Sequence, residues 1–542
     1  MPLAARRLKY LPLLFAVALL HGCARAPREA GVIRLAQEGD ASSLDPAKAY
    51  DTTCIPYVRV LYRGLLDYDD KAVLRPEVAR SYTVAPDGKS YTFTLRPDVF
   101  FHSGRRVVAQ DFRYAIERVL DPKTASDGSS FYGVITGADE FVKDLSKPVA
   151  QRKYLHVAGI EVPDQNTIRF RLKAADSTFL NILALPFAYA VPREHIERLA
   201  RQGKDFSEYP DGCGPFVLKE WTHDARLILE RNPRYFRAGL PRAQRIEVQF
   251  GNTPSLQIMR FEQGQSDLLM ISDANAPDFL RLTHDARWKP WITHAPMMDV
   301  RYITLNCEMK PFTDKRVRQA MNYAINRPRI VSFLAGRGTL AKGLLPPQMP
   351  GYNPRLKGYE YNPQKAKQLI REAGMEGKFP PLEMWYSTNE PWYEKAAQSI
   401  QGDLKQIGVN ITTRGVRYAE MKAKAGTRHG LEMAIMGWLQ DYTDPANFFD
   451  PLVNGKSITP TASLNRAFYS NPTVNKMLDA ALIEPNRAKR LAMYQAAEKI
   501  VVDDAPWVFL HHTERYAAQQ PWVRGFKLHP MWSQRLEWIS TE

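Results

Sequence analysis

Cysteine is scarce in this chain, which has four in 542 residues. No C-x-x-C pair is present, and wide spacing of this kind argues against a cysteine-ligated metal or a dithiol redox centre. Setting Cys23 aside as part of an N-terminal leader leaves Cys54, Cys213 and Cys307. Three thiols form at most one disulfide in an oxidising compartment. We expect small, buried thiols.

Enzyme motifs are also missing. The sequence contains no G-x-x-x-x-G-K-[ST], G-x-S-x-G or H-E-x-x-H pattern, the arrangements that bind phosphates, activate a serine or hold zinc. The segment Gly336-Arg337-Gly338 starts like a dinucleotide fingerprint, but Ala341 stands at the third glycine position. His511 and His512 are adjacent, so on a strand they point to opposite faces and do not readily share one ion. We expect no enzyme, no metal site and no cofactor.

Long apolar runs are absent except near the N-terminus. Basic residues precede an uncharged run from Leu11 to Leu20, which is about half of the roughly 20 residues that cross a bilayer. This arrangement predicts a signal peptide over residues 1–22 and therefore an exported protein.

The leader ends in Leu20-His21-Gly22-Cys23. A cysteine directly after a small residue at this point is where bacterial lipoprotein precursors are cleaved and acylated. We therefore expect Cys23 to carry a lipid that anchors the mature chain to a membrane, in the periplasm or elsewhere in the cell envelope. His21 is unusual in such a motif, and a plain secretory signal that is cut nearby is the alternative.

The net charge is positive but not segregated. It is +16, and removing Arg6, Arg7 and Lys9 with the leader leaves about +13. The 74 Lys and Arg are interspersed with 58 Asp and Glu and form no long basic run. A solvated basic surface explains this better than a nucleic-acid partner, and export argues further against one.

Strand and helix patterns alternate along the chain. Ser90 to Leu95 alternates apolar and polar residues after a Pro86-Asp87-Gly88 turn, which predicts a strand. Helical spacing follows Asp111 up to Leu120, and again after Asp314, a candidate N-cap. A further helix is expected between Asn362 and Gly374. These signals predict an α/β protein.

Several longer segments, in order and at matching intervals, resemble the bacterial extracellular solute-binding proteins of family 5, which serve ABC importers. The resemblance runs from about Leu35 to the C-terminus. Its segments are Ser43-Leu44-Asp45-Pro46, Asp87 to Arg96, Phe101-His102-Ser103-Gly104, Gly214-Pro215-Phe216, Glu230 to Phe236, Pro311 to Ala320 and Gly437 to Pro445.

This resemblance implies a two-lobed periplasmic-binding-protein fold (type II, cluster C) with a small inserted accessory domain. Projecting the family's boundaries gives lobe one as 24–63, 189–292 and 509–542, the accessory domain as 64–188, and lobe two as 293–508.

The resemblance also implies a function. The chain would be the substrate-binding component of an ABC importer, a monomer that captures short peptides between its lobes and delivers them to a membrane permease with its ATPase subunits. The alternative is the same fold binding a non-peptide solute, such as a nickel chelate, haem or a sugar derivative.

A receptor that tolerates many peptides must bind the parts they share, namely the backbone, the ammonium and the carboxylate. By motif, Asp441 is expected to bind the ammonium, since a carboxylate only accepts hydrogen bonds; capping of a turn before Pro445 is the alternative role. The segments expected to contact the ligand are Tyr50, Asp51 and Thr52 in lobe one and Gly437, Trp438 and Leu439 in lobe two. Trp438 is alternatively a core residue.

The sequence departs from some oligopeptide-binding relatives at the carboxylate end. Ile435 occupies the position where those members carry an arginine. Arg428, beside His429, is the candidate partner for the ligand carboxylate, with a surface arginine as the alternative. Trp392 is expected to provide an apolar wall.

Overall fold

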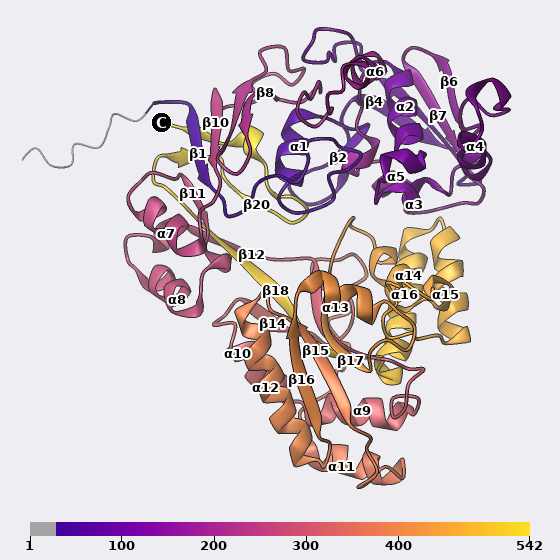
Figure 1. The fold of residues 1–542 in the computed structure, drawn as a ribbon, viewed down its shortest axis with the longest axis vertical. Coiled ribbons are helices and arrows are strands. Elements are labelled where there is room, and N and C mark those ends of the chain that lie inside the picture. The colour runs from indigo at the N-terminus through magenta and orange to yellow at the C-terminus, as the bar shows by residue number, and fades with distance from the viewer. Residues whose placement is uncertain (1–28) are drawn as a thin grey trace, which may run out of the picture.

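The computed structural model describes residues 29–542. The expected signal peptide and the lipid site at Cys23 lie outside these residues. The chain forms two lobes, one above the other in Figure 1, with an additional domain beside the upper lobe. We call the upper part the first lobe and the lower part the second lobe.

The first lobe is built on a four-stranded sheet, β1 (Val32–Ala36), β10 (Arg245–Gln249), β9 (Arg226–Arg231) and β8 (Phe216–Thr222), in that order. β1 is parallel to β10, and the other pairs are antiparallel. Alternate residues such as Leu227 and Leu229 are buried, as the two-residue period of a strand requires. Helix α1 (Ile55–Leu61) packs into the same core.

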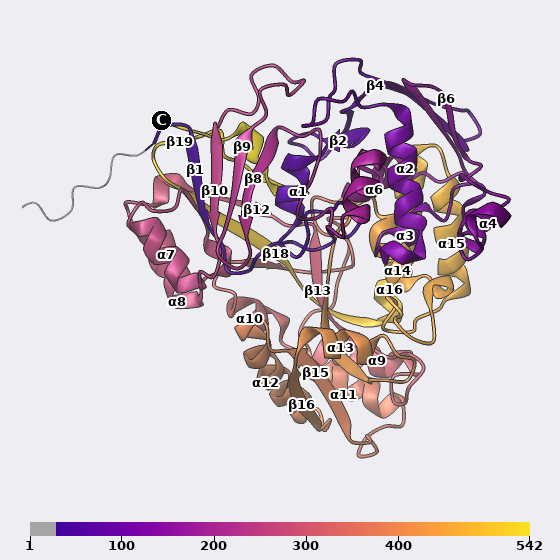
Figure 2. The ribbon, with the colours of Figure 1, turned by 45° about the horizontal axis from the view of Figure 1, so that its top comes forward.

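The accessory domain has its own antiparallel sheet, ordered β4 (Ala79–Val84), β5 (Ser90–Leu95), β7 (Thr167–Arg171) and β6 (Ile160–Asp164). Helices α2 (Ala109–Leu120), α3 (Ser129–Tyr132) and α4 (Ala138–Leu145) accompany it. Phe93 from β5, Phe112 from α2 and Phe170 from β7 meet in its core. Figure 2 shows α2 standing against this sheet.

The sheet of the second lobe contains β13 (Asp299–Leu305), β17 (Met433–Leu439), β15 (Leu382–Ser387) and β16 (Ile411–Val416). β15, β16 and β17 are parallel, and β13 is antiparallel to β17. Both faces of the central strands are covered, so β13 and β17 are mostly buried, whereas β16 at the edge has exposed polar residues. Ile303 and Ile435 enter one core and Tyr302 and Met436 the other. The covering helices are α9 (Lys315–Ala324), α11 (Pro363–Glu372) and α12 (Pro391–Gln406) on the first face, and α13 (Tyr418–Ala425), α14 (Ala446–Val453), α15 (Pro472–Ile483) and α16 (Arg487–Asp504) on the second.

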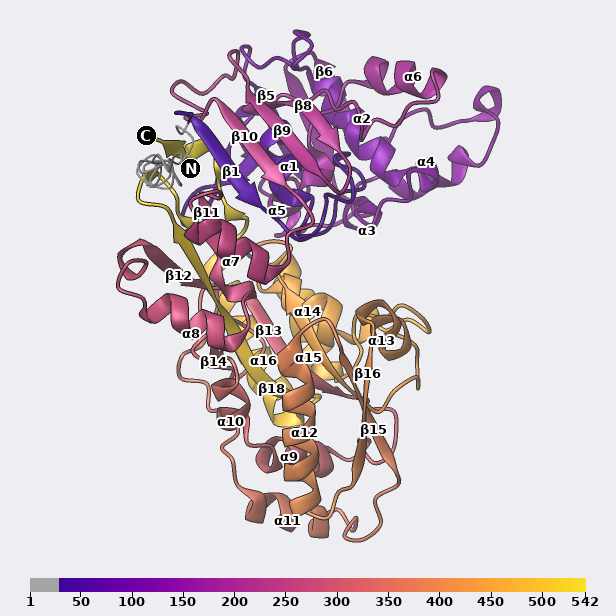
Figure 3. The same cartoon turned by 60° about the vertical axis from the view of Figure 1, so that its left-hand side comes forward.

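One long strand, β18 (Trp507–Gln519), runs through both lobes, as Figure 3 shows. Its first half pairs with β13 and β14 (Gly338–Leu340), and its second half pairs with β12 (Ile292–Pro296) and β11 (Leu268–Met270). Asp299, at the start of β13, accepts hydrogen bonds from Thr513 N at 2.8 Å and Thr513 Oγ1 at 2.7 Å. The lobes are therefore joined by the β12–β13 connection and by β18. The lobe boundaries expected from the sequence stay a prediction.

The remaining elements connect these layers. They are β2 (Leu66–Tyr68), β3 (Leu74–Pro76), α5 (Phe179–Ile182), α6 (Arg193–Arg201), α7 (Pro254–Glu262), α8 (Ala276–His284), α10 (Arg327–Ser332), β19 (Val523–Arg524), β20 (Leu528–His529), β21 (Ser533–Gln534) and β22 (Ser540–Thr541).

Cys54, Cys213 and Cys307 are free. The first two are buried, and Cys307 is half-buried. Burial raises the pKa of Cys54 and of Cys307 to about 11, so both stay protonated thiols. The expectation of small, packed thiols is confirmed for Cys54 and Cys213. Within residues 29–542, none of the helices has the length and apolar character that crossing a bilayer demands.

Candidate functional site

Asp441 lies where the two lobes meet. It follows the last residue of β17 by two positions, and its Oδ1 accepts a hydrogen bond at 2.6 Å from Tyr50 Oη, which belongs to the first lobe. Asn447, at the start of α14, holds the other side: its Nδ2 donates to Asp441 Oδ2 at 2.9 Å, and its Oδ1 accepts from Asp441 N at 2.9 Å. The carboxylate is thus fixed by both lobes.

Burial raises the pKa of Asp441, and the hydrogen bonds from Tyr50 and Asn447 oppose this effect. Among residues 29–542, no cationic side chain contributes to that balance. Each carboxylate oxygen has a further lone pair after accepting one bond. An added cation would relieve the cost of the buried charge. The turn before α14 is capped by Asp444, whose Oδ1 accepts from Ala446 N at 3.0 Å; this is the role considered for Asp441 as an alternative.

Tyr50 reaches Asp441 from the loop before α1. Its ring packs at 5.3 Å from that of Phe187. Asp51 turns into its own loop, where Oδ1 accepts from Thr53 N at 2.8 Å and from Cys54 N at 3.1 Å. Thr52 is exposed. Of the three residues expected here, only Tyr50 contacts Asp441, and Asp51 fixes the loop that carries Tyr50.

The segment Gly437 to Leu439 forms the end of β17 and pairs with β13 on one side. On its other side β17 pairs with β15 at Met433 and Ala434. Within the described residues this second ladder stops there, so the outward backbone groups from Ile435 to Leu439 have no strand beside them. Such an edge can accept an added strand.

Side chains of this segment have different surroundings. Trp438 is half-buried against the second-lobe core and donates from Nε1 to Asn447 Oδ1 at 3.2 Å, so it combines the core role with support of Asp441. Leu439 is 36% exposed. A Cβ on Gly437 would overlap Nη1 of Arg301. The glycine therefore makes room for an arginine side chain on β13.

The structure does not bring Arg428 to this place. Arg428 Nε and Nη2 donate to Glu308 at 2.7 Å each. Glu308 follows the end of β13 that pairs with Met433, the far end of β17 from Asp441. The surface-arginine alternative describes this contact, and Arg428 is not carried further as a ligand residue. Ile435 is fully buried in the core beneath α12.

Trp392 lies in the first turn of α12. Its ring is 4.9 Å from that of His511 on β18, and its Nε1 donates to Glu390 Oε2 at 2.6 Å. His511 pairs with Arg301 in the sheet. Trp392 therefore belongs to a group with Arg301, His511 and Glu390. The sequence pattern drew attention to His511 only as a possible metal ligand and to neither Arg301 nor Glu390. Arg301 could have been identified from the sequence, because it lies on the same strand face as Ile303 and Leu305 and a charged residue is unusual in such an apolar row.

The charged groups of the two lobes approach each other beside this group. Burial raises the pKa of Asp273, in the first lobe after β11, and the Glu390 carboxylate raises it further, while Arg515 and Arg337 oppose the shift. Glu390, in the second lobe, thus acts on a charge of the first lobe.

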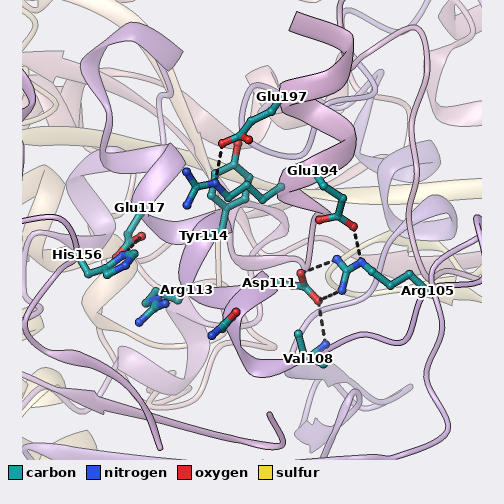
Figure 4. Close-up of a pocket in the computed structure, with 11 residues that line it drawn as sticks. Arg105, Val108, Asp111, Arg113, Tyr114, Glu117, His156, Glu194 and Glu197 are labelled. Carbon is teal, nitrogen blue, oxygen red and sulfur yellow. Dashed lines mark hydrogen bonds and ion pairs between the residues drawn. The ribbon is translucent and has the colours of Figure 1, made fainter. Parts of the chain in front are cut away.

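A separate pocket of about 270 Å³ lies between α2 and α6 (Figure 4). Its charged side chains pair with one another: Arg105 with Asp111 at 2.6 Å, Arg193 with Glu197 at 2.6 Å, and His156 with Glu117 at 3.1 Å. Arg113 also lines this pocket, and no ion pair involves it among the described residues.

Comparisons with known proteins agree with this architecture. A family model for bacterial extracellular solute-binding proteins, family 5 Middle, matches residues 73–459. The glutathione-binding protein GsiB of Escherichia coli is 29% identical over 532 residues, covering 97% of each chain. The heme-binding protein A of Haemophilus influenzae is 28% identical over 484 residues, covering 87% of this chain and 85% of that one.

Solved structures share the fold. The ABC transporter-associated periplasmic binding protein DppA from Helicobacter pylori, in complex with the peptide STSA, superposes with a TM-score of 0.77 at 25% identity, covering 94% of this chain and 98% of that one. The sequence match spans most of the chain, and the two-lobed arrangement agrees with it. The chain belongs to the bacterial extracellular solute-binding proteins, family 5.

Proposed function

We propose that this protein is the substrate-binding component of an ABC importer, that it captures short peptides between its two lobes, and that it delivers them to a membrane permease driven by ATPase subunits. The relative from Helicobacter pylori carries a bound peptide, and that from Escherichia coli is named for glutathione, itself a small peptide.

The Asp441 carboxylate carries this proposal. It lies between the lobes, it is half-buried, and its hydrogen-bond partners among residues 29–542 are uncharged donors. A peptide ammonium supplies the missing positive charge and several donors at once. The unpaired edge of β17 from Ile435 to Leu439 supports binding of the peptide main chain as an added strand.

Closure of the lobes links binding to transport. A ligand stabilises the closed form only by the difference between its affinities for the closed and open forms. A peptide touching Asp441 and the neighbouring Tyr50 contacts both lobes and so favours closure. The permease would then recognise the closed shape.

The remaining parts of the proposal concern location and assembly. Cys23 would carry the lipid anchor, the mature chain would work as a monomer in the periplasm or cell envelope, and the division into lobe one, accessory domain and lobe two would follow the boundaries expected from the sequence. The family name, which denotes extracellular proteins, supports the location.

The first prediction tests Asp441. We expect calorimetry to show binding of trialanine, and we expect Asp441→Asn to weaken it by about 3 to 5 kcal/mol, because the ammonium would be left without its carboxylate. N-acetylation of the peptide should cause a comparable loss in the unsubstituted protein and little further loss in the variant.

Asp479→Asn is a matched control, because Asp479 lies on α15 and pairs with Lys456 at 2.5 Å. It should leave affinity unchanged. Equal affinities of the unsubstituted protein for free and acetylated peptides would remove Asp441 from its proposed role.

Haem is the second candidate, because heme-binding protein A is a relative over 87% of this chain. Titrating the protein with haem while recording the haem absorbance distinguishes a haem-binding protein from a peptide-binding protein. Saturable haem binding without any binding from a mixture of short peptides would replace the peptide proposal, and a co-purified nickel chelate or sugar derivative in native mass spectrometry would do the same.

A further inference from the structure

Arg301 has a guanidinium whose hydrogen-bonding capacity is not met by the described residues. Its side chain is 26% exposed. The two nearest carboxylates are Asp299, at 3.4 Å from Arg301 Nε, and Glu390, at 3.8 Å from Nη2. Within residues 29–542 neither contact is a hydrogen bond. A guanidinium has several donors in a planar fork and is costly to leave unsatisfied when removed from water.

Both neighbouring carboxylates are engaged elsewhere. Asp299 accepts from Thr513 N and Oγ1 through its two oxygens. Glu390 Oε2 accepts from Trp392 Nε1 at 2.6 Å. These bonds hold the carboxylates near Arg301 without placing them in the bidentate geometry that arginine prefers.

Arg301 is positioned by packing and by these two long ion pairs. Gly437, opposite Arg301 in the sheet, provides the space that its guanidinium occupies. His511 is buried, and its Nδ1 has no hydrogen-bond partner among the described residues. Burial, followed by the charge of Arg301, lowers the pKa of His511 well below its usual value. A neutral His511 can donate through one ring nitrogen.

We propose that Arg301 binds the carboxylate of the ligand, with Gly437 and His511 shaping its site, and that the interlobe site thereby selects zwitterionic peptides. This rests on the proposed function. Asp441 would bind the ammonium of the peptide and Arg301 its carboxylate. Arg301, on the neighbouring strand, would thus take the role of the arginine that some relatives carry at the position of Ile435.

The spacing of the two ends sets the ligand length. Gly437, beside Arg301, and Asp441 are four positions apart, which is at most about 14 Å along an extended chain. An extended peptide advances about 3.4 Å per residue. Peptides of about two to four residues therefore fit between the two charges.

The test compares trialanine with trialanine amide, which lacks the carboxylate charge. We expect the unsubstituted protein to prefer the acid by about 10- to 100-fold, the range of a charged hydrogen-bonded contact. Arg301→Gln should bind the acid and the amide equally, while keeping its preference for a free over an acetylated N-terminus. Arg428→Gln, in the same lobe and paired with Glu308, is the matched control and should keep the preference for the acid.

Gly437→Ala tests the role of Arg301 in a second way, because the added Cβ would displace the Arg301 guanidinium and not the backbone. It should also lose the preference for the acid. An amide that carries a glutamate side chain tests whether a side-chain carboxylate substitutes for the terminal one. Equal binding of acid and amide by the unsubstituted protein, or an unchanged preference in Arg301→Gln, overturns this proposal while the peptide-binding function stands. Failure of every peptide to bind overturns both.

Discussion

At the scale of single residues, the half-buried carboxyl of Asp441 makes ligand binding sensitive to pH. Burial raises its pKa above the usual 3.8, so in the ligand-free protein it becomes protonated at a higher pH than an exposed aspartate. The ammonium ligand binds the ionised form. Affinity should therefore be full at neutral pH and should fall about tenfold per pH unit once the pH drops below the raised pKa.

Calorimetry with trialanine between pH 7.5 and 4.5 checks this expectation. Asp441→Asn should show a weak affinity that stays flat over the same range. An equally steep profile in the variant would show that another group controls binding.

The sequence predicts part of this site and misses the rest for physical reasons. The Gly437 to Pro445 motif leads to Asp441, but its partner Tyr50 is 391 positions away, and no local pattern encodes that contact. The contact of Asn447 with Asp441 is not predictable from the sequence either, because an asparagine near a helix start usually serves as a cap. Arg428 has the charge that a carboxylate requires, but strand pairing places it at the wrong end of β17.

At the scale of elements, sequence patterns predict a helix or strand correctly where its formation depends on residues that are close in the sequence. The strand Ser90–Leu95 is confirmed as β5. Asp314 caps α9 by accepting from Arg316 N at 2.8 Å, and Gly374, after α11, has φ +70°. Asp111 lies inside α2 rather than before it, because its carboxylate accepts from Val108 N and so closes the first turn. The pairing of β18 with strands from both lobes has no local signal, since it depends on long-range partners.

Helix α16 gives an element-scale prediction through Glu498. Its Oε1 accepts from Leu344 N at 2.9 Å and Leu345 N at 3.0 Å, which ties the loop before them to the helix. Burial raises the pKa of Glu498 from 4.5 to about 7. Between these values the unfolded chain loses this proton while the folded protein keeps it. The stabilisation is therefore complete below pH 4.5 and is lost as the pH rises through 7, a change of about 3 kcal/mol.

Urea unfolding at pH 5 to 8 measures this contribution. The free energy of unfolding of the unsubstituted protein should fall with rising pH relative to Glu498→Gln, whose amide keeps an acceptor for the two loop amides but does not titrate. Glu420→Gln, at an exposed position on α13, should follow the unsubstituted protein. Parallel curves for all three proteins would exclude Glu498 as the titrating group.

At the scale of the whole molecule, the second lobe makes direct hydrogen bonds to the first lobe and to the accessory domain; Figure 1 shows α14 and α15 below the accessory domain. Gln440 Nε2 donates to Pro530 O at 3.1 Å. Ser177 of the accessory domain donates from its backbone N to Leu482 O at 3.0 Å, and Arg490 Nη1 donates to Ser177 Oγ at 2.9 Å. These contacts exist only when the lobes are together, so they stabilise the closed form independently of any ligand.

The Ser177 hydroxyl therefore contributes to affinity without touching a ligand. Ser177→Ala removes the bond from Arg490, whose ion pair with Asp444 at 2.6 Å remains to satisfy its charge. The loss should be about 0.5 to 1.5 kcal/mol, which shifts the open–closed equilibrium and weakens peptide binding by about 2- to 10-fold. Ser332→Ala on α10, where the hydroxyl donates to Arg329 O within its own helix, should do neither. Small-angle scattering of the ligand-free variants should show a larger radius of gyration for Ser177→Ala alone, and equal radii with equal affinities would mean that this contact does not govern closure.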